Sequence, residues 1–174
     1  GGKYDSKAFQ KSVGLNGVGL KAVNALSQIF TVQSIRDNDT VIYNYQMGDL
    51  SSNTDISKSD LKNGTIITFV PDYNIFKKYK FLNEHIENQL WYYAYLNPNL
   101  TIYFNKNKIY SKDGLKDLLL KDNQHSSFIY PIIHLRDNDI EIAMSHGKQY
   151  SENYTTFVNG QNTTQGGTHL ASFR

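Results

Sequence analysis

The chain has 174 residues, of which 39% are hydrophobic and 20% charged, so it can form one sizeable core or two small ones. Its formal net charge of +2 is too small to indicate a nucleic-acid surface, and the lack of cysteine excludes disulfides and thiolate metal sites. The five histidines are too far apart for zinc ligands, and no apolar run could span a bilayer. We therefore expect a cytoplasmic protein with no membrane partner and no metal ligand in this chain.

The first half of the chain predicts a loop, a helix and several strands. A polar segment, 1–13, leads into three glycines at 14, 17 and 19, and the apolar stripe after them predicts a helix that ends near Ser27. A polar stretch, 48–63, lies further on. Three runs rich in β-branched and aromatic residues predict strands, the first two as a hairpin: 29–35, 40–46 and 64–70.

The second half predicts two helices and a second sheet. Apolar residues three and four apart predict a helix over 81–96. The polar segment 121–126 is the predicted domain boundary, which divides the chain into 1–122 and 123–174. The remaining elements are a strand at 100–105, a short helix at 115–120, and three strands of the second sheet at 128–135, 140–145 and 154–158. The fold class is therefore α+β.

The glycine loop has two interpretations. Closely spaced glycines let backbone N–H groups approach an anion, and a helix that begins there adds its free amides and the positive end of its dipole. The same glycines could instead allow the helix to pack closely. The order G-x-x-G-x-G differs from the dinucleotide fingerprint and lacks the Lys-Ser/Thr ending of a P-loop. The residues alone leave both interpretations open.

Three segments in order resemble the B subunits of type IIA topoisomerases, gyrase and topoisomerase IV, which are GHKL ATPases. The segments 1–5 and 13–27 are similar to the ATP lid and glycine motif of that family, and Gly64-Thr65 with Phe69 and Pro71 is similar to its GT strand. Residues 157–159 with the Gly-Gly-Thr-His segment at 166–174 resemble part of its transducer domain. The resemblance implies the C-terminal part of a GHKL (Bergerat) sheet-and-helix sandwich over 1–122 and the start of a transducer β-sheet domain over 123–174.

The resemblance also implies an ATP site. Backbone amides of the glycine loop would wrap the triphosphate, Lys3 would approach the phosphates, and Thr65 would help to hold the adenine. Asn16 stands where bacterial relatives have His, and Phe9 stands where many have Tyr, so a hydroxyl contact to the nucleoside is lost there. The implied binding residues are Lys3, Gly14, Leu15, Asn16, Gly17, Val18, Gly19 and Thr65.

The resemblance implies that no catalytic residue lies in this chain, because the general-base Glu and the Asn that holds Mg²⁺ precede the glycine motif in the family. Glu84 and Asn88 have a similar spacing but follow the motif, and we interpret them as the solvated face of a helix. In the Gly-Gly-Thr-His segment we expect Thr168 to cap the next helix, and we expect a structural role rather than catalysis.

The function implied by the resemblance is that of a fragment of the B subunit of an ATP-dependent type II DNA topoisomerase. In the intact enzyme, ATP and Mg²⁺ would drive dimerisation of two B subunits and, with the topoisomerase A subunit, passage of one DNA segment through another. The fragment alone would be inactive. The alternative is an isolated, non-catalytic structural or interaction module with no nucleotide bound.

Overall fold

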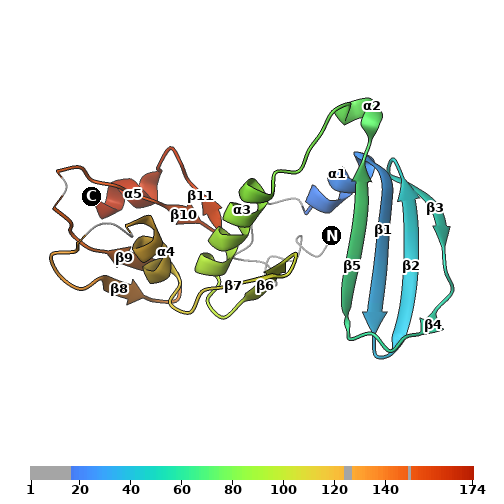
Figure 1. Ribbon diagram of the computed structural model, residues 1–174, viewed down its shortest axis with the longest axis horizontal. Coiled ribbons are helices and arrows are strands. Elements are labelled where there is room, and N and C mark those ends of the chain that lie inside the picture. Colours follow the sequence, from blue (N-terminus) through green and yellow to red (C-terminus); the bar gives the residue numbers. More distant parts are fainter. Residues whose placement is uncertain (1–16, 124–126, 149) are drawn as a thin grey trace. The chain divides into compact units, whose positions relative to one another are not determined.

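The computed structural model describes residues 17–123, 127–148 and 150–174, and the chain forms two compact units that meet in sequence between Lys80 and Phe81 (Figure 1). This division does not coincide with the predicted boundary at 121–126. Helix α4 (Leu115–Asp122) packs against strand β9 (Glu141–Met144), so the segments on both sides of the predicted boundary share one unit. The assignment of 1–122 and 123–174 to two family domains stays a prediction.

The first unit is an antiparallel sheet with a short helix at one end. The strand order is β3-β2-β1-β5, and β4 also pairs with β2. The elements are α1 (Gly19–Ala25), β1 (Ser27–Arg36), β2 (Asp39–Gln46), β3 (Asp49–Asn53), β4 (Ser57–Lys58), β5 (Gly64–Pro71) and α2 (Tyr73–Phe76).

The predicted hairpin in this sheet is confirmed. Arg36 lies opposite Asp39 at its turn, and β1 also pairs along its length with β5, the third predicted strand. The two turn residues, Asp37 and Asn38, have φ of 52° and 65°, a conformation that Asp and Asn tolerate better than other residues with a side chain. The hydrophobic pattern therefore placed the central strands correctly.

Strands β3 and β4 were not predicted, because their residues carry no apolar alternation. All the residues of both strands are exposed, and they pair with β2 through the backbone at the edge of the sheet. Edge strands of this kind are polar and short in many proteins, which limits pairing with other chains. Sequence pattern alone does not separate them from a loop.

Three hydrogen bonds hold the junction between α1 and β1 at the end of the sheet. The hydroxyl of the buried Ser27 donates to the Val23 carbonyl at 2.6 Å, and the Met47 N–H donates to the Ser27 carbonyl at 2.9 Å. The Asp72 N–H donates to the Leu26 carbonyl at 3.0 Å. These bonds determine where the glycine turn before α1 lies in this unit.

Asp72→Ala is expected to lower the free energy of unfolding by about 1 kcal/mol, since Asp72 is the N-cap of α2. The Asp72 side chain is buried, and its carboxylate accepts the Asn74 N–H at 2.8 Å. Urea unfolding of the two proteins measures the difference. Asp55→Ala, at an exposed position outside the helices and strands, is the control and should change the free energy by less than about 0.5 kcal/mol.

The described residues of the second unit form three separate two-stranded sheets and three helices. Its elements are α3 (Asn83–Leu96), β6 (Thr101–Phe104), β7 (Asn107–Tyr110), α4, β8 (Ile133–Arg136), β9, β10 (Phe157–Val158), β11 (Gln161–Asn162) and α5 (Thr168–Phe173). The prediction of one second sheet is wrong: β8 pairs with β9, whereas β10 pairs with β11 and with neither of them.

The core of the second unit lies where α3 meets β6, β7 and α4. Tyr95 and Ala94 of α3, Ile109 of β7 and Leu118 of α4 are all at most 5% exposed. The predicted helices at 81–96 and 115–120 are confirmed. No helix among the described residues is both long enough and apolar enough to cross a membrane.

Candidate functional site

The glycine turn at the start of α1 has backbone amides that no described side chain caps. Gly17 has φ of 63°, which favours glycine, and Val18 is the N-cap residue of the helix. Within the part of the chain that the structure describes, no side chain caps this N-terminus, and the first turn of α1 carries no acidic residue. Residues 17–20 are all exposed. The first N–H groups of α1 therefore belong to exposed residues and have no side-chain cap from a described residue, so an anion at this surface could accept them.

The space around Gly19 argues against a packing role for this glycine. A Cβ built on Gly19 has no heavy atom within 4 Å in the described part of the chain. A glycine that lets a helix pack closely would show a near neighbour at that point. A glycine that lets a ligand approach the backbone would show open space, as Gly19 does.

Four of the predicted binding residues lie outside the described residues: Lys3, Gly14, Leu15 and Asn16. The structure places Gly17, Val18 and Gly19 together at the start of α1. The remaining prediction, Thr65, concerns a residue of the sheet and is described next.

Thr65 is the second residue of β5, and it lies opposite Ser34 of β1. It is exposed and lies six residues before Pro71, which corresponds to about 20 Å of extended strand. Helix α1 contacts β5, and its end is bonded to Asp72 just beyond Pro71 (Figure 1). Helix α1 is about 10 Å long, which is about half of the strand length between Pro71 and Thr65. Even if α1 ran back along β5, its first residue, Gly19, would lie about 10 Å or more from Thr65. A ligand that contacts both Gly19 and Thr65 must therefore be elongated.

The Gly-Gly-Thr-His segment forms the start of α5, but Thr168 is not its cap. The N-cap residue is Gly167, which makes no side-chain cap bond, and Thr168 is the first helical residue. The expected capping role of Thr168 is therefore wrong. His169 Nε2 lies 3.1 Å from the Thr163 hydroxyl oxygen, and a Cβ on Gly167 would lie 2.9 Å from the His169 ring. Gly167 thus allows the imidazole to lie against the backbone.

Glu84 and Asn88 are both exposed on α3. Their position agrees with the interpretation of a solvated helix face. Among the described residues no group of three His, Cys, Asp or Glu side chains is arranged to hold a metal ion.

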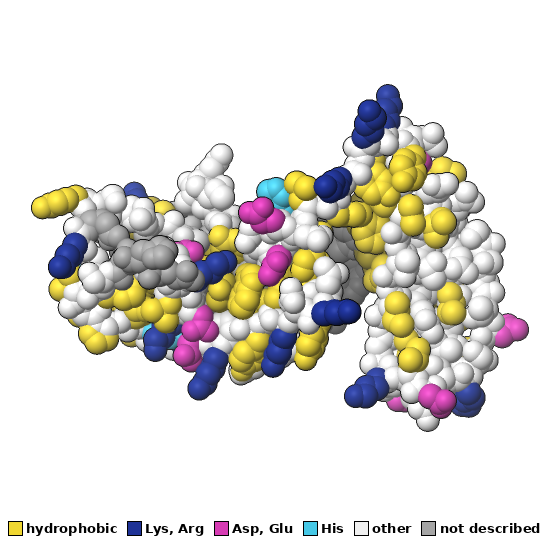
Figure 2. All heavy atoms as spheres, in the orientation of Figure 1, with side chains coloured by type: hydrophobic (Ala, Val, Ile, Leu, Met, Phe, Trp, Pro, Cys, Tyr) yellow, Lys and Arg dark blue, Asp and Glu magenta, His cyan; other side chains and the backbone are white. Residues whose placement is uncertain are grey.

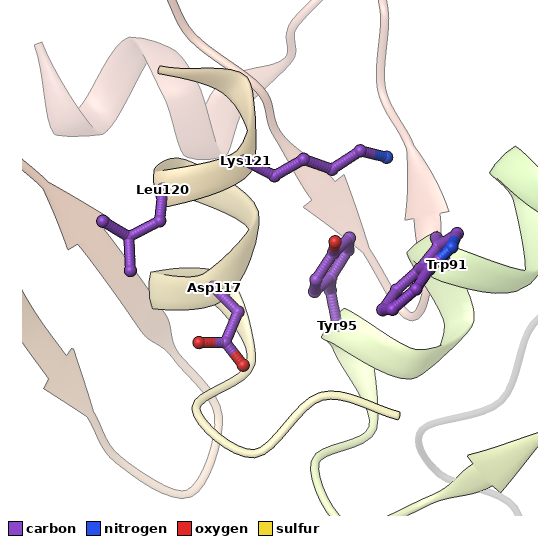
Figure 3. A pocket seen from close by; sticks show the side chains of 5 residues that line it. All are labelled: Trp91, Tyr95, Asp117, Leu120 and Lys121. Atoms are coloured by element: carbon purple, nitrogen blue, oxygen red, sulfur yellow. The ribbon is translucent and has the colours of Figure 1, made fainter. Parts of the chain in front are cut away.

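A surface hollow lies between α3 and α4, and the sequence analysis did not predict it (Figure 3). Trp91 and Tyr95 stack with ring centroids 5.4 Å apart, and the Lys121 ammonium lies 5.8 Å from the centroid of the Tyr95 ring. Asp117 and Leu120 complete the lining. The i, i+4 spacing of Trp91 and Tyr95 was the available signal, since side chains at that spacing share one face of a helix.

Hydrogen bonds rather than a ligand explain the acidic group in this hollow. Asp117 Oδ2 accepts the Ser111 hydroxyl at 2.7 Å, the Asp113 N–H at 2.9 Å and the Lys112 N–H at 3.1 Å. Burial by itself would raise the pKa of Asp117, but these bonds outweigh burial and lower it. Burial, and then the negative charges of Asp117 and Asp122, raise the pKa of the Tyr95 phenol. This arrangement joins α4 to the loop before it.

Asp117→Asn is expected to lower the free energy of unfolding by about 1 to 2 kcal/mol at pH 7. The pKa of Asp117 in the folded state lies below its ordinary value of 3.8, so the ionised carboxylate stabilises the fold above that value. The stabilisation is lost as the pH falls through the lowered pKa, and the difference between the two proteins should shrink below about pH 4. Urea unfolding at pH 7 and pH 2.5 tests this. Asp113→Asn, an exposed control, should change the free energy of unfolding at pH 7 by less than about 0.5 kcal/mol.

Comparison with known proteins relates this fold to one group. Residues 94–174 match the family model described as DNA gyrase B. The B subunit of DNA topoisomerase 4 from Borreliella burgdorferi is 41% identical over 174 residues, which cover 100% of this chain and 29% of the relative. The B subunit of DNA gyrase from Helicobacter pylori is 32% identical over 189 residues, which cover 100% of this chain and 24% of that protein.

A solved structure of a gyrase B ATPase domain is also similar to this chain. The 43K ATPase domain of Thermus thermophilus gyrase B, in complex with an aminocoumarin, matches with a TM-score of 0.76 and 25% identity. The match covers 91% of this chain and 47% of that one. The α+β fold predicted from the sequence is therefore confirmed, and its class is that of gyrase B ATPase domains. The chain is therefore similar, along its whole length, to the B subunits of topoisomerase IV and gyrase. It spans less than a third of the length of these curated relatives.

Proposed function

We propose that this chain is the part of an ATP-dependent type II DNA topoisomerase that holds the phosphates of ATP in the B subunit. The observation that carries the proposal is the start of α1, where a glycine at positive φ precedes exposed residues whose amides no described side chain caps, and where a Cβ on Gly19 would meet no described atom within 4 Å. In the proposal, the other phosphate contacts come from Lys3, Gly14, Leu15 and Asn16, and Thr65 contacts the adenine.

The separation of Thr65 from the glycine turn supports a nucleotide rather than a simple anion. Of the roughly 20 Å of strand between Thr65 and the end of β5 near α1, helix α1 can span at most about 10 Å, so about 10 Å or more separates Thr65 from Gly19 and one phosphate ion does not contact both. A nucleoside triphosphate is elongated and carries a base at one end and phosphates at the other. Backbone amides fixed at the start of α1 stabilise negative charge on the phosphates, and they need no proton transfer.

The proposal assigns the general base and the Mg²⁺ ligand to residues that precede the glycine loop in the family, as the resemblance implies. When bound, Mg²⁺ would neutralise charge on the phosphates. In the intact protein, ATP binding would drive association of two B subunits in the cytoplasm. With the topoisomerase A subunit, this would move one DNA segment through another.

The test is hydrogen exchange of the full-length B subunit with and without a non-hydrolysable ATP analogue. We expect slower exchange of the amides over 17–22 when the analogue is bound, and analogue-dependent dimerisation in sedimentation. The amides of β6 and β7 are the internal control and should not change. If the analogue binds without protecting residues 17–22, the phosphate site lies elsewhere. If neither the full-length protein nor this chain binds the analogue, the non-catalytic module is the better description.

A further inference from the structure

The hairpin of β6 and β7 has one buried face and one exposed face. Ile102 and Ile109 lie opposite each other on the inner face, where Ile109 is 1% exposed. On the outer face Tyr103 lies opposite Lys108, and Tyr103 is 69% exposed. Strand alternation therefore separates an apolar side that contacts α3 from a polar side that faces solvent.

The outer face is basic. Residues 100–112 contain three lysines, Lys106, Lys108 and Lys112, and no acidic residue. All three are exposed, and none of them forms an ion pair within the described part of the chain. Figure 2 shows dark-blue and yellow side chains next to each other over this part of the second unit. Lys106 and Lys108 therefore present positive charge to an anionic partner, whereas Lys112 is followed by Asp113 and its N–H donates to the Asp117 carboxylate at 3.1 Å.

Two tyrosines lie between the lysines. The Lys108 ammonium lies 5.1 Å from the centroid of the Tyr110 ring, so the aromatic ring holds this lysine in place. The Tyr110 hydroxyl donates to Asn99 Oδ1 at 3.3 Å, whereas the Tyr103 hydroxyl forms no hydrogen bond to any described residue. We name Tyr103, Lys106, Lys108, Tyr110 and Lys112 the lysine–tyrosine face.

The backbone holds these groups in a fixed row. Asn105, with φ of 54°, begins the two-residue turn and puts Lys106 at the tip of the hairpin. From Lys106 to Tyr110 the chain extends over about 13 Å, which is the axial length of about four steps of a DNA strand. Ammonium groups and tyrosine hydroxyls are common partners of DNA phosphates.

We propose that the lysine–tyrosine face binds the phosphate backbone of duplex DNA. The inference rests on the proposed function, which makes DNA the substrate of the intact enzyme, and adds the surface that contacts it. The small area and high charge of the face favour a polyanion over a protein partner, because protein interfaces have cores poor in lysine. The contact is independent of DNA sequence, since phosphates carry no base information.

The experiment uses fluorescence anisotropy to measure binding of a labelled 30-base-pair DNA duplex to the full-length B subunit from 50 to 300 mM KCl. In the test variant Lys106, Lys108 and Lys112 are replaced by Gln. The matched control replaces Lys62, Lys78 and Lys148, which are exposed, with the same change of net charge. We expect the test variant to bind at least about tenfold more weakly at 100 mM KCl. The slope of log K against log salt should fall by about 2 to 3.

The control variant should retain the slope of the wild type, and both variants should retain ATP hydrolysis without DNA. Equal affinities and slopes in the test and control variants would overturn the proposal. Absence of DNA binding by the wild type would also overturn it, and binding of an ATP analogue in the same samples shows separately whether the proposed function stands. If the test variant keeps its DNA affinity but no longer associates with the A subunit, the face binds protein and the proposal is wrong.

Discussion

Gly19→Ala in the full-length B subunit is expected to lower kcat/KM for ATP about 100-fold, or about 2.7 kcal/mol in transition-state free energy, while the protein remains folded. A methyl group at this position meets no described protein atom within 4 Å, so the fold accommodates it. Alanine in a helix also stabilises the helix relative to glycine, by about 1 kcal/mol. In the proposed site, the methyl group occupies the space through which a phosphate reaches the amides.

Gly19→Ala is expected to raise the stability of the fold but to lower kcat/KM, so loss of activity cannot be attributed to unfolding. Thermal unfolding should show a melting temperature equal to or above that of the wild type, and steady-state kinetics should show the loss. Ala22→Ser is the matched control, since it adds one atom to an exposed position on the same helix. Its kcat/KM should stay within about twofold. If Gly19→Ala retains full activity, the start of α1 does not hold the phosphates.

Gly114→Val is expected to lower the free energy of unfolding of the second unit by about 3 to 5 kcal/mol. Gly114, the N-cap residue of α4, has φ of 59° and ψ of −121°, a conformation that strains residues with a side chain. A Cβ there would lie 3.0 Å from Pro98 Cγ and 3.1 Å from both Glu141 Oε1 and the Tyr95 carbonyl oxygen. Two of these neighbours belong to backbone or a proline ring and move little.

Trp91 provides the measurement, because it is the single tryptophan of the chain and stacks on Tyr95. Urea unfolding followed by its fluorescence should show a lower midpoint for Gly114→Val and an intermediate one for Gly114→Ala. Gly64→Ala is the control, since its Cβ would meet only the Lys62 carbonyl oxygen at 3.9 Å. A Gly114→Val protein as stable as the control would mean that the loop before α4 rearranges freely.

The sequence predicted elements well where one face is buried. The period of α3 follows from its packing against β6, β7 and α4, and the β1–β2 hairpin follows from residues suited to strands on both sides of Asp37 and Asn38. Pairing partners were harder to predict. β10 pairs with β11 through the turn at Asn159 and Gly160, whose φ values are 49° and 83°. The two-residue turn brings β11 beside β10, and the alternation of apolar residues along a strand does not indicate such a turn.

The candidate site was predicted in part. The glycine spacing indicated the start of α1, but it did not show that Gly19 faces open space, since that depends on the neighbours of the folded chain. The roles of Lys3, Gly14, Leu15, Asn16 and Thr65 stay predictions. The hollow between α3 and α4 was missed because its lining comes from two helices, with Trp91 and Tyr95 on α3 and Lys121 on α4, and helical periodicity does not show which helices pack together.

The position of β5 at the end of the strand order has a consequence for handling this chain. Its outer side presents backbone N–H and C=O groups that pair with no described strand, and its Ile66 and Ile67 are 47% and 41% exposed. Such an edge is a template for another strand. We therefore expect β5 to favour self-association of this chain at high concentration, which sedimentation at increasing protein concentration would measure.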